Sequence, residues 1–202
     1  MIHKQILLYG LINAPSVPEW MLQEARDSST QGKNSDRVIN NHGDDFTRRT
    51  LYKNGQAYTN SFNWSSTMSD RSLSWVRSNV ATNAKDVRSV NTTPGLERNG
   101  AHCDRSRVMT LIYLIDSGGI DHQTVFYREK GVTDLIRSPG THVDNYDSLE
   151  QLASIKVQLN RWNLLYGHVL HSIENIPQGR FSIQVSLDEL PDNLSIDMGL
   201  YT

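Results

Sequence analysis

The pattern of hydrophobic and polar positions changes character near residue 85, and before that point it predicts two helices. The first covers residues 18–26 and opens on a proline, which fits the first helical turn because its missing N–H has no helical partner there. The second begins after Ser69. Its apolar face, at the helical spacing i, i+3 and i+7, consists of Leu73, Val76 and Val80.

A polar stretch rich in serine and asparagine, residues 28–63, lies between these helices. Its composition predicts loops and short strands. Asn54 and Gly55 favour positive φ, so a hairpin turn over residues 53–56 is predicted within the stretch. The sequence shows no internal repeat and no low-complexity tract.

From residue 85 onward, short apolar segments alternate with turn residues, a spacing typical of a β-sandwich or barrel. The predicted strands cover residues 85–90, 107–115, 123–129, 162–169 and 180–187. One or two helical turns are predicted around residues 148–154. The pattern therefore predicts a mainly β fold with flanking α-helices, in which the helices come first and an antiparallel core follows.

The last predicted strand has the strictest alternation. Its apolar face consists of Phe181, Ile183, Val185 and Leu187, and its polar face of Arg180, Ser182, Gln184 and Ser186. By itself, this pattern is typical of an edge or surface strand whose polar face lies in water. The motifs that precede the strand favour another interpretation of its polar face.

Composition and charge restrict the class of protein. A chain of 202 residues, 37% of them hydrophobic, can bury a sizeable core in one domain. No apolar run is long enough for a transmembrane helix, and the first residues lack a small-residue cleavage site, so we expect no signal peptide. The single cysteine excludes an intramolecular disulfide and a zinc ribbon, and it fits a reducing compartment. We therefore expect a soluble, cytoplasmic protein.

The charge distribution also bears on possible partners. With 20 basic and 22 acidic residues, the chain has no global field that would attract nucleic acid or an acidic membrane. It also lacks a basic strip with interleaved aromatic residues. We therefore expect neither a nucleic-acid partner nor a membrane. The oligomeric state is not predicted.

His102 and Asp104 carry an imidazole and a carboxylate at positions i and i+2. In extended backbone alternate side chains share a face, so both can reach one cation while Cys103 points away and packs. A third ligand must come from elsewhere, and His171, at the end of a predicted strand, is the best placed. Two histidines and one carboxylate on one face of a metal are the facial triad of non-haem Fe(II) oxygenases.

His168 is the nearest alternative to His171. In a strand the two side chains would face opposite sides, and His168 lies further from the loop that would open the site. The remaining histidines are interpreted as ordinary surface or core residues: His3, His42, His122 and His142. We therefore prefer His171 as the third ligand.

Several motifs follow one another in a characteristic order. They are Pro94-Gly95, His102-Cys103-Asp104, a strand, Gly118-Gly119, Thr124-Val125-Phe126, His171 and Arg180. In this combination residues 85–190 resemble the Fe(II)/2-oxoglutarate-dependent dioxygenase superfamily, in the branch that includes the prolyl hydroxylases. The resemblance implies a double-stranded β-helix, or jelly roll, whose wide mouth holds the iron. We then expect one domain over residues 1–202, with residues 1–84 supporting the catalytic core and residues 191–202 forming a tail.

The resemblance also implies roles for individual residues. His102, Asp104 and His171 would be the metal ligands. Arg180 would pair with the distal carboxylate of 2-oxoglutarate, a contact that suits the fork of a guanidinium, and Ser182 would touch the same carboxylate. The alternation of the last strand independently places Arg180 and Ser182 on one face, which favours a barrel lining over a surface.

Two further features bear on the resemblance to the family: the position of Tyr113 and a long polar stretch between the two halves of the motif. The family commonly has a tyrosine on the strand after H-x-D that contacts 2-oxoglutarate, and Tyr113 is the candidate here. Tyr113 is one position out of step with an alignment on Thr110, which puts Leu114 at that place, so a packed strand aromatic is the alternative. The polar stretch over residues 137–147 is predicted to be a mobile lid over the mouth.

The implied activity is an oxidative hydroxylation that uses Fe(II), 2-oxoglutarate and O₂ and releases succinate. The pattern favours a protein or peptide side chain as substrate over a small molecule, and we expect residues 1–84 and the mouth loops to select it. Two alternatives stay open at this point. One is a cupin-like metal protein that does not use 2-oxoglutarate, and the other is a non-catalytic jelly-roll binding protein.

Overall fold

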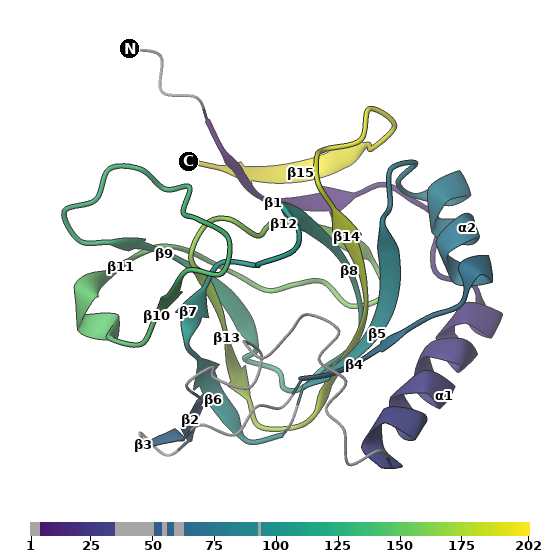
Figure 1. Cartoon of the computed structure of the whole chain (residues 1–202), viewed down its shortest axis with the longest axis horizontal. Coiled ribbons are helices and arrows are strands. Elements are labelled where there is room, and N and C mark those ends of the chain that lie inside the picture. Colours follow the sequence, from purple (N-terminus) through teal and green to yellow (C-terminus); the bar gives the residue numbers. More distant parts are fainter. Residues whose placement is uncertain (1–4, 35–50, 54–55, 59–62, 93) are drawn as a thin grey trace.

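The structure, a computed structural model, consists mainly of two antiparallel β-sheets that face each other (Figure 1). It describes residues 5–34, 51–53, 56–58, 63–92 and 94–202. The predicted turn over residues 53–56 falls partly outside this set, because residues 54–55 are not described. The strands on either side of the turn pair antiparallel, with Lys53 opposite Gln56, as a hairpin requires.

Within the described residues, the first sheet has seven strands in the order β15-β1-β12-β8-β14-β5-β4. Their bounds are β1 Leu7–Ile12, β4 Asn63–Thr67, β5 Asp86–Thr92, β8 Met109–Ser117, β12 Trp162–Tyr166, β14 Arg180–Leu187 and β15 Ile196–Tyr201. β14 lies between β8 and β5, so it is a central strand. Because both neighbours cover its edges, the interpretation of this segment as an edge or surface strand is wrong.

The second sheet has the order β10-β7-β13-β6-β2-β3, with β9 also beside β13 and β11 beside β9. Its strands are β2 Leu51–Lys53, β3 Gln56–Tyr58, β6 Leu96–Asn99, β7 Ala101–His102, β9 Gln123–Glu129, β10 His142–Val143, β11 Leu149–Ile155 and β13 His171–Ile176. Apolar side chains of both sheets meet between them, among them Leu114 of β8 and Phe126 of β9. This arrangement is the jelly roll that we predicted.

Two helices, α1 (Glu19–Asn34) and α2 (Asp70–Asn79), cover the outer face of the seven-stranded sheet (Figure 1). The side chain of Ser69 caps α2 by accepting a hydrogen bond from the backbone N–H of Ser72. Met21 and Val76, one from each helix, are fully buried in one apolar cluster with Ile183 and Val185 of β14. Among the described residues, neither helix is long and apolar enough to cross a membrane.

The structure confirms several predicted elements and corrects others. The strands over residues 123–129 and 180–187 and the helix after Ser69 lie where they were predicted. The first helix runs to Asn34 rather than to residue 26, because once a helix has formed it continues through polar residues that leave no apolar signal.

The segment around residues 148–154 is a strand, not helical turns. Only Tyr146–Ser148 forms a short 3₁₀ turn, and β11 follows it directly. β11 pairs along its length with β9, with Leu149 opposite Glu129 and Ile155 opposite Thr124. The pairing with a neighbouring strand thus overrides the local preference of this segment.

The two ends of the chain also form strands that the pattern did not predict. β1 pairs with β12 on one side and with β15 on the other. Residues 191–202, expected as a tail, therefore include an edge strand of the first sheet. Residues before position 85 likewise supply β1 and β4 to that sheet.

Candidate metal centre

Three buried side chains converge at the mouth between the two sheets. His102 ends β7, Asp104 follows it after one residue, and His171 begins β13. The strand register places His171 directly opposite His102. One ligand atom from each of the three residues lies within 4.8 Å of the others, a geometry compatible with a single metal ion. The structure thus brings together the three residues that were predicted as ligands.

Backbone carbonyls orient both imidazoles. Nδ1 of His102 lies 2.9 Å from the carbonyl oxygen of Gly100, and Nδ1 of His171 lies 2.9 Å from that of Val169. A carbonyl can only accept, so each Nδ1 carries a proton, and in the neutral imidazole Nε2 is then the atom with the free lone pair. Histidines that bind metal through Nε2 are commonly held in this way.

Asp104 is held in its ionised form by its neighbours. Its Oδ2 accepts hydrogen bonds from Nε of Arg107 at 2.9 Å and from Oγ1 of Thr110 at 3.1 Å. Burial by itself would raise the pKa of Asp104, but the Arg107 guanidinium, with His171 and His102, holds it well below its usual range. The carboxylate is therefore available as an anionic ligand at neutral pH.

The backbone at Gly167 lies close against Asp104, which the absence of a side chain at Gly167 allows. Its N–H donates to the carbonyl oxygen of Gly167 at 2.7 Å. A Cβ at position 167 would lie 2.9 Å from both Cβ and Oδ2 of Asp104, a separation that real Cβ atoms do not show. Gly167 is therefore required for the present position of the carboxylate.

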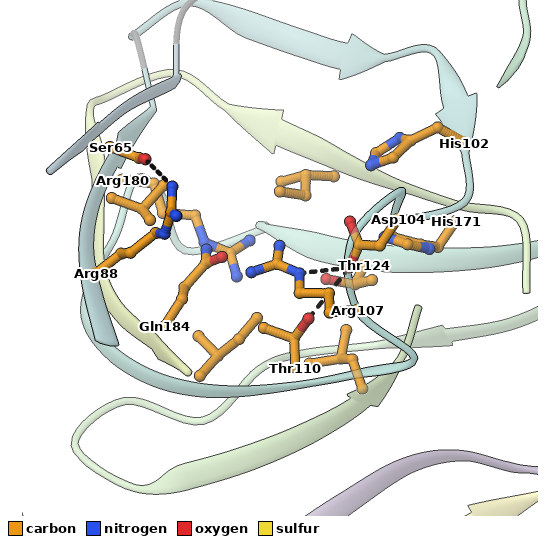
Figure 2. A pocket seen from close by; sticks show the side chains of 14 residues that line it. Ser65, Arg88, His102, Asp104, Arg107, Thr110, Thr124, His171, Arg180 and Gln184 are labelled. Carbon is orange, nitrogen blue, oxygen red and sulfur yellow. Dashed lines mark hydrogen bonds and ion pairs between the residues drawn. The ribbon is translucent and has the colours of Figure 1, made fainter. Parts of the chain in front are cut away.

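Arg180, at the start of β14, lines the cavity that leads away from the triad (Figure 2). Its residue exposure is 3%, and Nη1 has no hydrogen-bond partner among the described residues. Burial lowers the pKa of Arg180 to about 10, so the guanidinium remains charged at neutral pH. A buried charge that lacks a counter-ion is costly, and an anion bound in the cavity would offset that cost.

Ser182 and Tyr113, the other two predicted contacts of 2-oxoglutarate, do not line the cavity. Ser182 is buried and accepts a long hydrogen bond, 3.3 Å, from Nε2 of Gln184, which does line it. Tyr113 packs on Trp162, with ring centroids 5.3 Å apart, in the core beneath the helices. Because side chains alternate along β8, Tyr113 faces away from Thr110, which lines the cavity, and the alternative of a packed strand aromatic fits its position.

Cys103 and His168 also lie outside the cavity. Cys103 is buried in an apolar cluster with Val125 and Leu170, where burial raises the pKa of its thiol to about 12. It therefore packs and faces away from the triad, as predicted. His168 is half-buried, and its ring makes an edge contact with that of Tyr166, at 6.3 Å between centroids.

The polar segment over residues 137–147 lies along the strand that carries the first ligand. Within it, β10 pairs with β7, so that His142 lies opposite His102. The N–H of Cys103 donates to the carbonyl oxygen of Thr141 at 2.8 Å, and the hydroxyl of Tyr146 donates to that of Asn99. These contacts hold the segment beside the triad, and its role as a mobile lid stays a prediction.

Two arginines of the cavity were missed by the sequence analysis. Arg107 ion-pairs with Asp104, and Arg88 of β5 faces the cavity from the strand next to β14 (Figure 2). Arg107 had a local signal, because it lies three residues after a proposed ligand. Arg88 had no local signal in the sequence. It lies two residues before Val90, which also lines the cavity, but this spacing does not point to the cavity unless the strand order is known.

No protein-family model matches the chain, and no curated protein matches it. Among solved structures, its fold is similar to that of the non-haem α-ketoglutarate-dependent carbocyclase SnoK from nogalamycin biosynthesis. The match has a TM-score of 0.52 and 11% sequence identity, and it covers 96% of this chain and 89% of SnoK. This similarity shows that the chain shares the overall fold of that protein. The resemblance to the prolyl-hydroxylase branch stays a prediction.

Two further structures match less well. A cupin-like protein from Thermotoga maritima has a TM-score of 0.28 and 15% identity, with 68% of this chain and 76% of that chain covered. The ycfD protein of Escherichia coli has a TM-score of 0.43 and 14% identity, with 89% of this chain and 55% of that chain covered.

Proposed function

We propose that the protein is an Fe(II)- and 2-oxoglutarate-dependent oxygenase that hydroxylates a C–H bond of a small molecule or a protein side chain. One observation carries the proposal. A buried triad of two histidines and one carboxylate shares a cavity with Arg180, a buried cation whose Nη1 has no partner among the described residues. A metal that needs open positions and an anion that needs a guanidinium would satisfy both features.

The donor set fits Fe(II). Nε2 of His102, Nε2 of His171 and a carboxylate oxygen of Asp104 are the nitrogen and oxygen ligands of a facial triad. Because Arg107 and Thr110 already engage Oδ2, Asp104 would bind the metal through Oδ1. Three protein ligands leave positions for the cosubstrate and O₂.

The chain's own residues would bind and orient the reactants. Arg180 would receive the distal carboxylate of 2-oxoglutarate and so direct its other end toward the triad. Apolar side chains on both walls, including Ile112 and Ile173, would exclude water from the space between. Bound Fe(II) would couple the oxidation of 2-oxoglutarate to succinate and CO₂ with insertion of the second oxygen atom of O₂ into the substrate.

Metal content and succinate release test the proposal. Protein purified without oxygen is expected to bind one Fe(II) and to convert 2-oxoglutarate to succinate, slowly even without substrate. His171→Ala should lose both properties, whereas the matched control His168→Ala should keep them. Metal binding without succinate would favour a jelly-roll metal protein that does not use 2-oxoglutarate. Full activity in His171→Ala would show that the triad is not the metal site.

A further inference from the structure

The cavity contains a second buried arginine that the proposed reaction does not use. Arg88 of β5 lies directly opposite Gln184 of β14 in the sheet register. Its side chain is only 10% exposed. Figure 2 shows Arg88 and Ser65 at the end of the cavity away from His102 and His171. Arg88 is therefore a cation enclosed in the same space as the triad.

The neighbours of Arg88 compensate its charge only weakly. Nη2 lies 3.4 Å from Oδ2 of Asp86, and Nη1 lies 3.5 Å from Oγ of Ser65. Both separations are long for a charge-assisted hydrogen bond. The other carboxylate oxygen of Asp86 accepts from Oγ of Ser186 at 2.8 Å. Nε of Arg88 has no partner among the described residues, although it is buried.

The charges that line the cavity do not balance. Among the described residues, three guanidinium groups, those of Arg88, Arg107 and Arg180, face it together with one carboxylate, that of Asp104. Arg107 is paired with Asp104, and Arg180 is reserved for 2-oxoglutarate in the proposed function. A divalent metal and the doubly charged 2-oxoglutarate would cancel each other, which leaves the charges of Arg88 and Arg180. Asp86, beside Arg88, offsets one of these two, so one positive charge remains. An enclosed surplus of this kind favours one further anion.

We propose that Arg88 binds an anionic group of the substrate, a carboxylate or a phosphate. This inference rests on the proposed function and adds the class of substrate to it. Gln184 and Ser65 would supply further polar contacts beside the guanidinium. The substrate thus enters with its anionic end at Arg88, which directs the rest of the molecule toward the triad.

The remaining lining defines the body of that substrate. It is mainly apolar, with Val90, Ile112, Leu165 and Ile173, and Thr124 adds one hydroxyl. These side chains come from strands of both sheets, so they would surround an apolar group. The favoured substrate therefore combines an apolar body with one anionic end, and the C–H bond to be oxidised belongs to the apolar part.

A titration with a matched pair of probes tests the role of Arg88. Phenylacetate and the neutral phenylacetamide differ in charge and share an apolar ring. Calorimetry on the Mn(II)-loaded, 2-oxoglutarate-saturated protein is expected to show that phenylacetate binds at least about tenfold more tightly than phenylacetamide, as one charge-assisted contact would give. Arg88→Gln should abolish that preference and leave the affinity for 2-oxoglutarate within about twofold.

Two further variants keep the result interpretable. Arg88→Met retains the unbranched stem, and it replaces Arg88→Gln if the latter does not fold. Arg128→Gln is the matched control, because Arg128 forms an exposed ion pair with Glu150 and does not line the cavity. The control should behave as the wild type in every titration.

Three results would overturn the proposal. They are the absence of a preference for phenylacetate in the wild type, a preference that survives in both Arg88 variants, and a loss of 2-oxoglutarate affinity in Arg88→Gln. The last would assign Arg88 to the cosubstrate.

Titrations of the wild type with Mn(II) and 2-oxoglutarate come first and test the proposed function separately. If they fail, an Arg88-dependent preference for phenylacetate in the metal-free protein still supports the anion site, and its absence there rejects it.

Discussion

Nε of Arg107 lies 2.9 Å from Oδ2 of Asp104, and both side chains are largely buried, at 15% and 8% exposure. Arg107 lies just before β8, and Thr110 of β8 donates a hydrogen bond to the same oxygen. Two donors on one oxygen restrict the rotation of the carboxylate. The pair therefore links the charge and the orientation of Asp104 to a residue that is not itself a ligand.

Replacing Arg107 by glutamine should weaken metal binding. Without the guanidinium, the carboxylate loses a charge-assisted hydrogen bond and rotates more freely, and changes to such outer partners cost about ten- to a hundredfold in affinity. Calorimetric titration with Mn(II) measures the effect. Arg105→Gln is the matched control, because Arg105 is exposed and does not line the cavity. Equal affinities for the two variants would show that Arg107 does not position the ligand.

Replacing Arg180 by methionine should weaken the binding of 2-oxoglutarate and raise the stability of the unliganded protein. The variant keeps an unbranched apolar side chain and loses the guanidinium, so the affinity for 2-oxoglutarate should fall at least about tenfold while Mn(II) still binds. Since the change also removes a buried charge, the free energy of unfolding of the unliganded protein should rise by about 1 kcal/mol or more. Chemical denaturation and calorimetry measure the two effects. Unchanged 2-oxoglutarate affinity would remove Arg180 from the cosubstrate site.

The parts of the site that could be predicted from the sequence are those that depend on strand alternation. Alternation around Cys103 places His102 and Asp104 on one face, and the same rule on β14 separates Arg180 from the core side chains. The register that brings His171 opposite His102 is long-range. His171 is selected as a ligand by its place at the end of a predicted strand and by the order of motifs, and neither gives that register.

Other parts depend on strand order and on single-residue register. Arg88 faces the cavity because β5 lies beside β14, and no local sequence pattern predicts that neighbour. Tyr113 shows the converse, because a shift of one residue along β8 turns a side chain from the cavity to the core. β11 and β15 were missed since their extended form comes from pairing with β9 and β1.

Replacing Gly167 by alanine should disturb the triad through its backbone. The new Cβ would lie 2.9 Å from Cβ and Oδ2 of Asp104 and 3.2 Å from the carbonyl oxygen of Arg107, so the carboxylate has to move. We expect a loss of about 1–3 kcal/mol in the free energy of unfolding, together with weaker Mn(II) binding. Gly179→Ala is the control, since among the described residues its Cβ would meet only the carbonyl oxygen of Thr92, at 3.6 Å. A Gly167→Ala protein that binds Mn(II) as tightly as the wild type would contradict the close approach.

Metal binding should raise the thermal stability of the protein. His102 ends β7, Asp104 lies two residues after it, and His171 begins β13. Only the folded chain therefore brings the three ligands within 4.8 Å of one another. Metal at about 100 times its dissociation constant would then stabilise the native state by about 2.7 kcal/mol. The shift is measured from melting curves under three conditions: with Mn(II), with magnesium, and after chelation. Magnesium is the control, because it is a harder ion that should bind more weakly. Asp104→Asn, which keeps the size of the side chain and removes its charge, should lose most of the Mn(II) effect. An equal rise in the melting temperature of wild type and variant would place the stabilising metal elsewhere on the chain.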